Sequence, residues 1–154
     1  MFREMRRNDR ALSAAEAEKL LAHGEYGVLS TNGEGGYPYG VPLSYAYVDG
    51  VVYFHSAMTG AKLDNLAVCD KVSFCVVGRT QTLPDKFSTE YESVVVFGRA
   101  TAVTGEEKQK ALLALVQKYS PDFLESGKAY IERAAAKTNV IKVAVEHMTG
   151  KARR

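Results

Sequence analysis

VVYFHSAMTGAKLDNLAVC, residues 51–69, places a strand, a short polar loop and a helix in immediate succession. Its first four residues are β-branched or aromatic, and the DG pair at 49–50 is a strong hairpin-turn signal. After Gly60 the pattern becomes helical, because Leu63 and Leu66 are three positions apart and share one helix face. The stretch therefore predicts a hairpin strand that passes through a small loop into a helix.

The junction between this strand and this helix is a candidate phosphate site. Backbone N–H groups in the first turn of a helix lack partners, and the helix dipole adds partial positive charge there. Ser56, Thr59 and Lys62 add two hydroxyl donors and a cation at the same place. Other roles stay open: one of the hydroxyls caps the helix, Lys62 is solvated, and His55 is a structural histidine at the end of the strand.

Residues 37–48, YPYGVPLSYAYV, predict an exposed strand with one flat face. Proline cannot donate to a strand ladder, so Pro38 and Pro42 indicate an edge strand or a bulge. Alternation places Gly40, Pro42 and Ser44 together on the face with small side chains. Free backbone groups beside such a strip can hydrogen-bond the rim of a planar heterocycle. The alternative is an edge that proline protects from pairing with other chains.

The composition is that of one globular domain over residues 1–154. Hydrophobic residues make up 46% and charged residues 25%, which suits one core. A net charge of +2 is too small to indicate a nucleic-acid surface, and the basic ends, 1–12 and 150–154, are expected to be flexible tails. There is no apolar run of about twenty residues and no apolar segment behind the charged N-terminus, so a cytoplasmic protein is expected.

The two cysteines, Cys69 and Cys75, predict buried free thiols. They do not form a CxxC pair, and no second pair is present, so no zinc site of that type is predicted. No other metal site is predicted.

The remaining elements predict a mainly β fold. A capping box at Ser13 and Glu16 starts a helix. A polar segment over 79–93 is expected as a long loop that is functional or crosses a subunit boundary. The predicted helices are 13–23, 61–69, 106–119 and 129–137, and the predicted strands are 26–31, 37–48, 51–56, 72–77, 93–103 and 140–147. Hairpins without regular β–α alternation favour a small antiparallel barrel with helices at its side.

Three segments resemble a known family. They are PYGVPLSYAYVDGVVYFHSAMTGAKLDNL (38–66), SVVVFGRA (93–100) and IKVAVEHMTGKA (141–152). Together they resemble the flavin-binding split-barrel proteins related to pyridoxamine 5′-phosphate oxidase, and among these the nitroimidazole-resistance (Nim-like) branch. The resemblance implies a six-stranded antiparallel split β-barrel that forms a homodimer, with two FMN sites between the subunits.

The same resemblance implies site residues by position. The FMN phosphate and ribityl chain would be held by His55, Ser56, Ala57, Gly60, Lys62 and Leu63, and the isoalloxazine ring would be lined by Tyr39, Gly40, Val41, Pro42, Leu43 and Ser44. It also associates His55 with the reacting centre, where the imidazole would donate a proton to a nitro group; the alternative is a hydrogen bond to the flavin. The end HMTGKARR lacks the Arg and His set of the true oxidases, so vitamin B6 oxidation is not expected.

The predicted function is therefore that of an FMN-dependent oxidoreductase, with nitroimidazole-like compounds as candidate substrates. One alternative is a haem- or flavin-binding module without turnover, in which His23, His55 or His147 would be an axial ligand. Another is a reductase that uses deazaflavin F420. The segment 79–93 is the candidate contribution from a second subunit.

Overall fold

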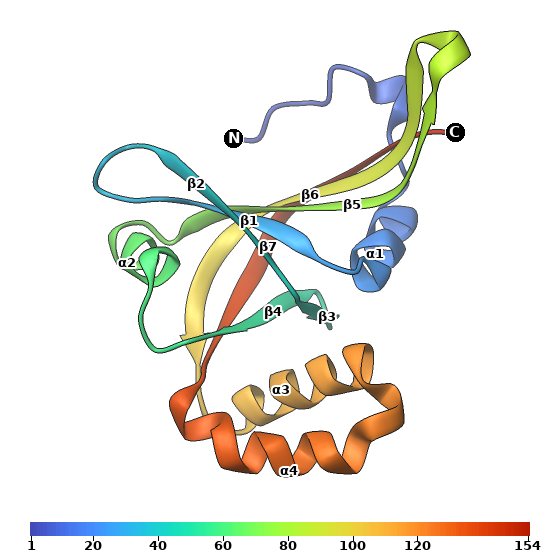
Figure 1. The fold of residues 1–154 in the computed structure, drawn as a ribbon. Helices are drawn as coiled ribbons and strands as arrows, with labels where there is room; N and C mark the ends of the chain where they lie inside the picture. The colour runs from blue at the N-terminus through green and yellow to red at the C-terminus, as the bar shows by residue number, and fades with distance from the viewer.

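One antiparallel sheet with helices packed around it makes up the fold, and the computed structural model describes all residues from Met1 to Arg154 (Figure 1). The seven strands follow the order β2-β1-β5-β6-β7-β4-β3. They are β1 (Gly27–Asn32), β2 (Pro38–Leu43), β3 (Ala46–Val48), β4 (Val51–Ser56), β5 (Lys71–Leu83), β6 (Ser88–Val103) and β7 (Asn139–Arg153). The α-helices are α1 (Ala14–His23), α2 (Ala61–Val68), α3 (Gly105–Tyr119) and α4 (Leu124–Ala134). A mainly β fold with flanking helices is confirmed.

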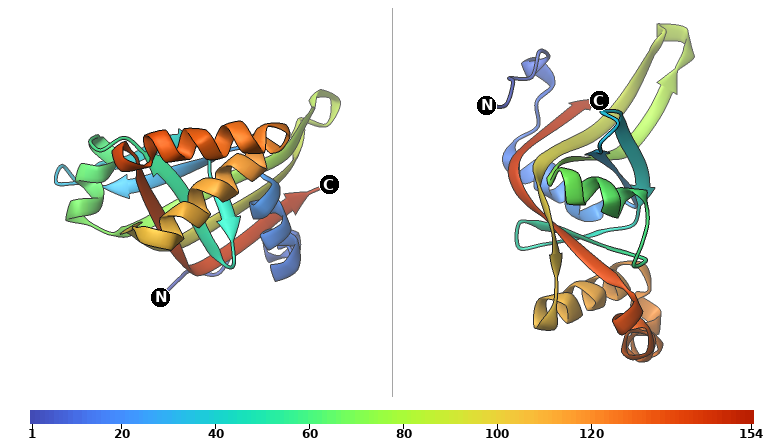
Figure 2. Two further views of the ribbon diagram at one scale, coloured as in Figure 1. Left: turned by 90° about the horizontal axis from the view of Figure 1, so that it is seen from below. Right: turned by 90° about the vertical axis from the view of Figure 1, so that its left-hand side faces the viewer.

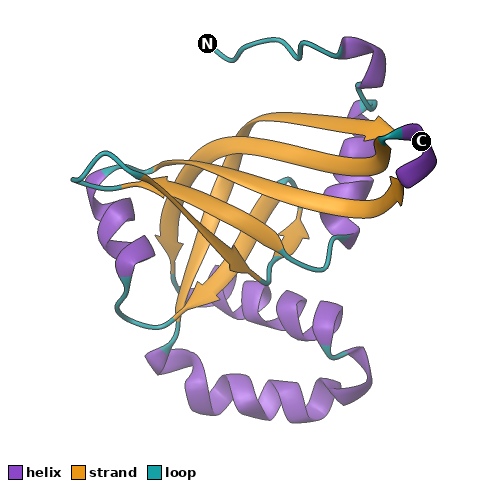
Figure 3. Cartoon of the chain, turned by 45° about the horizontal axis from the view of Figure 1, so that its top comes forward, coloured by secondary structure: helices purple, strands orange, loops and turns teal.

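The sheet is a split barrel whose two edge strands are consecutive in the chain. β2 lies at one end of the strand order and β3 at the other, yet only Ser44 and Tyr45 separate them. The chain itself therefore closes the barrel, while no ladder joins β2 to β3 (Figure 3). The expected count of six strands becomes seven, because the single strand predicted over 37–48 is interrupted at these two residues.

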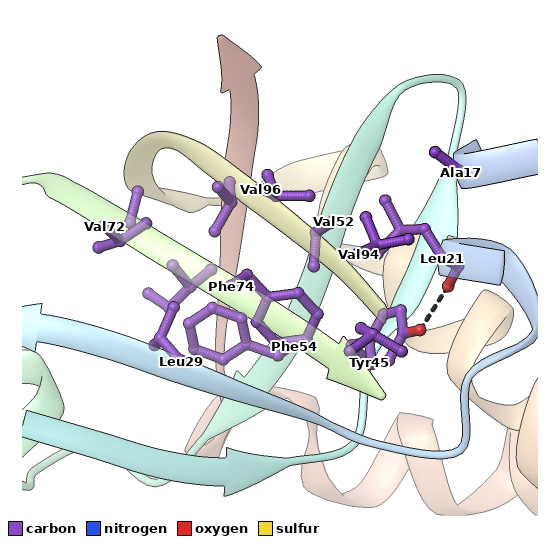
Figure 4. Close-up of a cluster of buried hydrophobic side chains, with 14 residues drawn as sticks. Ala17, Leu21, Leu29, Tyr45, Val52, Phe54, Val72, Phe74, Val94 and Val96 are labelled. Carbon is purple, nitrogen blue, oxygen red and sulfur yellow. Dashed lines mark hydrogen bonds between the residues drawn. The ribbon is translucent and has the colours of Figure 1, made fainter. Parts of the chain in front are cut away.

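Fourteen buried side chains fill the inside of the barrel (Figure 4). Tyr45 is among them, and its ring packs edge-on against Phe74 with the centroids 4.8 Å apart. The hydroxyl of Tyr45 donates a hydrogen bond to the backbone carbonyl of Leu21, as a buried tyrosine hydroxyl requires. The residue that interrupts the strand is thus anchored in the core.

Each helix covers a different part of the barrel. The predicted capping box at the start of α1 is present, and Leu21 of this helix joins the barrel core. α2 adds Leu63 and Leu66 to the same core. α3 and α4 form a hairpin that packs beside β3 and β4 through a second cluster, which includes Leu115 and Ile131 (Figure 2). None of the helices combines the length and apolar character that crossing a membrane requires.

Three strands extend further than the sequence predicts. β5 and β6 continue through the segment 79–93, expected as a loop, and form a ribbon that turns at Pro84–Lys86. Figure 1 shows this ribbon extending beyond the barrel. β7 continues to Arg153, so residues 150–153, expected in a flexible tail, pair with β6. Hydrophobic alternation indicates strands only where one face is buried, and these extensions are mostly polar.

The N-terminal segment lies against β7. The N–H of Leu12 donates to the carbonyl of Gly150 at 2.9 Å, and Ala11 forms an isolated bridge with Lys151. Further out, the ring of Phe2 stacks on His147 with a centroid distance of 4.6 Å. The segment expected as a flexible tail therefore contacts the barrel through backbone and aromatic groups.

Candidate functional site

β2 is an edge strand with small side chains on its outer face. Its only strand partner is β1, so its second backbone edge is free. Val41 and Leu43 pack against the core, whereas Gly40 and Pro42 alternate with them and are exposed, as is Ser44. The flat strip and the edge position predicted for this stretch are both present. A planar ring lying here would meet small side chains and unpaired backbone groups.

The start of α2 has backbone donors without partners. Gly60 occupies the N-cap position with φ 150°, and no side chain caps the helix. The first helical hydrogen bond runs from the N–H of Asp64 to the carbonyl of Gly60 at 3.1 Å. The N–H groups of residues 61–63 precede it and have no acceptor within the helix. These donors and the half-buried Lys62 form a donor set that suits a phosphate group.

The two hydroxyl side chains predicted beside Lys62 differ in position. Ser56 is 6% exposed, and its hydroxyl donates to the carbonyl of Ala57 at 2.9 Å. Thr59 is exposed and caps nothing. Thr59 is therefore the hydroxyl available to a ligand at the start of α2, while Ser56 offers its backbone.

A hydrogen bond between Asn65 and Thr31 holds α2 beside β1. The side-chain nitrogen Nδ2 of Asn65 donates to Oγ1 of the buried Thr31 at 3.0 Å. Thr31 lies opposite Tyr39 in the β1–β2 register. A Cβ atom at Gly33 would lie 2.1 Å from Oδ1 of Asn65, so only glycine permits this approach. The start of α2 and the exposed strip on β2 are thereby fixed to the same strand.

His55 and Ser44 meet at one cavity. His55 is exposed on the outer face of β4, and its neighbours Phe54 and Ser56 are buried on the inner face. Ser44 and His55 both line a cavity of ≈ 290 Å³ beneath the α3–α4 hairpin. The β3–β4 hairpin brings these residues together, because its register, which pairs Ala46 with Tyr53, sets Ser44 opposite His55 when it is continued by two residues.

The structure groups the predicted residues into three adjoining parts: the β2 strip, His55, and the start of α2. The loop from Ala57 to Gly60 joins the last two parts directly. The side chains of Val41, Leu43 and Leu63 pack against the core. Those three side chains are partly buried, so they offer a ligand backbone groups and part of their apolar surface, whereas the buried Ser56 offers only its backbone.

Sequence analysis missed Tyr119 and Lys118 at the end of α3. The hydroxyl of Tyr119 donates to the carbonyl of Glu25 at 2.6 Å and accepts from the N–H of Tyr45 at 3.1 Å. Nζ of Lys118 donates to the carbonyl of Tyr45 at 3.0 Å and lies 3.7 Å from the centroid of that ring. Burial lowers the pKa of Lys118 to about 8, although both contacts favour the ammonium form. A local sequence pattern cannot predict the contact between Tyr119 and Tyr45, because these residues are 74 positions apart.

The three histidines have different surroundings. Nδ1 of His23 lies 2.7 Å from the carbonyl oxygen of Lys19, and His147 stacks on Phe2. The side chain of His55 has no hydrogen-bond partner within the chain, so both of its ring nitrogens are available to a ligand.

Comparison with known proteins places this site in a family context. The family model for pyridoxamine 5′-phosphate oxidase matches residues 13–152. Comparison with curated proteins found no match.

Three solved structures are similar over nearly the whole chain. A FAD-binding protein from Mesorhizobium loti is 28% identical, with a TM-score of 0.68 and coverage of 94% of this chain and 98% of that chain. A candidate 5-nitroimidazole antibiotic resistance protein from Bacteroides thetaiotaomicron is 24% identical, with a TM-score of 0.79 and coverage of 92% and 86%. A flavocytochrome from Azotobacter vinelandii is 18% identical, with a TM-score of 0.80 and coverage of 98% and 72%. The last two likenesses concern the fold alone.

Proposed function

The chain belongs to the pyridoxamine 5′-phosphate oxidase family, and from this premise we propose that it is an FMN-binding oxidoreductase that reduces a small organic acceptor. The observation that supports the proposal best is the adjacency of an uncapped helix start, an exposed edge strand and a histidine without partners. A flavin mononucleotide has a terminal phosphate, a planar ring with polar rim atoms, and a reactive centre, and each of these has a counterpart in the site.

The start of α2 would bind the phosphate. The N–H groups of residues 61–63 point along the helix axis toward the loop, and Lys62 adds a positive charge. FMN ends in a single phosphate, which this donor set matches. The Mesorhizobium relative is a FAD-binding protein, so FAD is the flavin against which FMN must be compared.

The β2 strip would hold the ring, and His55 would serve the reaction. Backbone groups on the free edge of β2 would orient the polar rim of the ring, while Gly40 and Pro42 leave its face unobstructed. A flavin, when bound, supplies reversible electron transfer to an acceptor. A ring nitrogen of His55 would hold a proton and donate it to the acceptor, a role in which histidine is common. The acceptors to test first are nitroimidazole-like compounds, in line with the Bacteroides protein.

A homodimer with two FMN sites between the subunits completes the proposal. A ring on the β2 strip would be covered by this chain on one side only, because Tyr37 and Gly40 are exposed there. The ribbon of β5 and β6 is the candidate element for contact with a second subunit, and Phe87 at its turn is 97% exposed. Sedimentation of the flavin-loaded protein should give the dimer mass; the monomer mass with flavin bound would contradict a shared site.

The absorption spectrum of the purified protein tests the flavin proposal directly. FMN, FAD, F420 and haem are added to separate samples, and the unbound fraction is removed before each spectrum is recorded. We expect stoichiometric FMN, with flavin bands that bleach on addition of dithionite. A protein that takes up neither flavin but gives a sharp Soret band with haem would replace the proposal by the haem-binding alternative. A single violet band after addition of F420 would favour the deazaflavin alternative.

A further inference from the structure

We infer that the cavity beneath the α3–α4 hairpin binds a neutral, single-ring aromatic molecule, and that this molecule is the electron acceptor. The second part of the inference rests on the proposed function, whereas the binding itself does not. The argument depends on the volume of the cavity, the charge of its walls and the position of its polar groups.

The walls of the cavity are mainly apolar. Twelve residues line its volume of ≈ 290 Å³, and eight of them are hydrophobic. The helices contribute most of this apolar surface, through Leu112, Leu115 and Val116 on α3 and Ile131 and Ala134 on α4. Tyr130, which is 64% exposed, also lines the cavity, so the space is reached from solvent.

Volume and charge together restrict the ligand. An apolar cavity of about 150 Å³ accommodates benzene, so this cavity has room for one ring with substituents. No Asp, Glu, Lys or Arg side chain lines it. His55 is the only cationic partner that the walls could offer, so an ion moved from water into such a space would lose most of its hydration for at most one charged contact, which is unfavourable. A phosphorylated ligand such as a vitamin B6 phosphate is therefore a poor fit, whereas a neutral nitroarene or quinone suits the cavity.

Some polar side chains of the cavity are free to bind a ligand. The hydroxyl of Thr138 is already bonded to the carbonyl of Ala134 at 2.9 Å, and that of Tyr119 to the carbonyl of Glu25. Ser44 and His55 on the sheet, and Ser120 and Tyr130 on the helix side, have no such side-chain partners. Of these four, only His55 carries an imidazole, so a nitro or carbonyl group that takes up a proton is expected to face the end with Ser44 and His55.

This end of the cavity adjoins the β2 strip. Ser44 directly follows β2, and His55 lies one residue before the end of β4. A molecule bound between the helices would thus present its polar end where the proposed flavin ring lies. The geometry assigns the α3–α4 hairpin a function in acceptor binding, in addition to its packing on the sheet.

A matched pair of neutral and anionic probes tests the inference on flavin-free protein. 4-Nitrobenzyl alcohol and 4-nitrobenzoate have similar shapes, and calorimetric titration measures the affinity of each. We expect the neutral probe to bind at least about tenfold more tightly than the anion. Equal affinities of the two probes would overturn the assignment of a neutral ligand.

Ala134→Leu fills the cavity, and Ala136→Leu adds the same atoms at an exposed position nearby that does not line it. The first change should weaken binding of the neutral probe about tenfold or more, and the second should leave it within about twofold. Circular dichroism verifies the fold of each variant. Ala134→Met, with a more adaptable side chain, replaces the leucine variant if that protein does not fold. Unchanged probe binding in the folded cavity variant would overturn the site.

FMN affinity, measured separately on the same variants, distinguishes this inference from the proposed function. Ala134→Leu should bind FMN like the unaltered chain, but with a raised KM for the neutral acceptor. A protein that binds no flavin but binds the probe in an Ala134-dependent way would refute the acceptor role and retain the site. Loss of the dimer mass in Ala134→Leu but not in Ala136→Leu would assign the cavity to a second copy of the chain and overturn the inference.

Discussion

The hydroxyl oxygen of Tyr119 lies 3.1 Å from the backbone nitrogen of Tyr45 and accepts its hydrogen bond. This contact joins the end of α3 to the interruption between β2 and β3. A backbone N–H that would extend a strand ladder is instead satisfied by a helix side chain. The contact lies where β2 passes into β3, beside the cavity that Ser44 and Tyr119 both line.

Removing this hydroxyl should destabilise the fold. In Tyr119→Phe the N–H of Tyr45 and the carbonyl of Glu25 lose their partner, which should cost about 1–3 kcal/mol in the free energy of unfolding. Urea denaturation measures this difference. Tyr130→Phe is the control, because that exposed hydroxyl has no hydrogen bond, and its effect should stay within about 0.5 kcal/mol. Equal effects of the two changes would refute the structural role of the Tyr119 hydroxyl.

Gly33→Ala should displace the side chain of Asn65, whereas Gly35→Ala should not. A Cβ at Gly33 would lie 2.1 Å from Asn65 Oδ1, but a Cβ at Gly35 would meet only a Tyr37 ring atom at 3.8 Å. Displacing Asn65 leaves the hydroxyl of buried Thr31 unpaired, so we expect a loss of about 1–3 kcal/mol and weaker FMN binding. Denaturation and flavin titration measure both effects. Two alanine variants with the same stability would contradict this anchoring contact.

Lys62→Ala should weaken FMN binding by about 1.5–3 kcal/mol if Nζ makes a charge-assisted contact with the phosphate. At high ionic strength the difference in FMN affinity between the unaltered protein and the Lys62→Ala variant should be smaller, because salt screens exposed charges. Fluorescence titration gives the Kd. Lys110→Ala removes an exposed lysine on α3 and should leave the Kd unchanged. An unaltered Kd in the Lys62 variant would remove this lysine from the phosphate site.

His55→Ala should separate flavin binding from turnover. If the imidazole donates a proton to the acceptor, the variant retains bound FMN but reduces a nitro compound about 10²-fold or more slowly, the usual range for general acid catalysis. Single-turnover kinetics of the reduced protein measures this step. His147→Ala, which disrupts the stack on Phe2, should leave the rate unchanged. Normal reduction by the His55 variant would exclude its catalytic role.

Lys118 should make stability depend on pH above neutrality. Its pKa is about 8 in the folded protein, because of burial, against 10.5 when solvated. Below pH 8 both states bind the proton, and the buried ammonium destabilises the fold in full. Between these values the unfolded state binds more protons, so stability rises with pH. The unfolding free energy of the unaltered chain should therefore rise relative to Lys118→Met from about pH 8 to about pH 10; a constant difference would show that Lys118 titrates normally.

Most elements of this fold could be predicted from local sequence. The capping box at Ser13 starts α1, and the turn between β3 and β4 has positive φ at both Asp49 and Gly50, as its sequence indicates. The prolines of β2 predicted its edge position correctly. Each of these signals depends on the backbone conformations that a few adjacent residues can adopt. These limits are the same whatever the rest of the fold.

The candidate site could be predicted only in part. The β2 strip and the start of α2 have local signals, which the resemblance to flavin-binding proteins reinforced. Leu43 and Leu63 were named with them, and their side chains pack partly buried against the core, as strand alternation and helical spacing indicate. The extended ribbon of β5 and β6 was missed, because a hairpin with solvent on both faces has no hydrophobic period.

The sequence by itself thus determined the fold class, the caps and turns, and the residues from which a flavin site could be built. Only the tertiary structure decided that the strand over 37–48 breaks at Tyr45, that Asn65 bonds Thr31, and that Ser44 meets His55 in one cavity. The physical reason is the range of the interactions. Caps and turns satisfy backbone groups within a few residues, whereas the Asn65–Thr31 bond and the cavity under the α3–α4 hairpin exist only after segments far apart in the sequence have packed together.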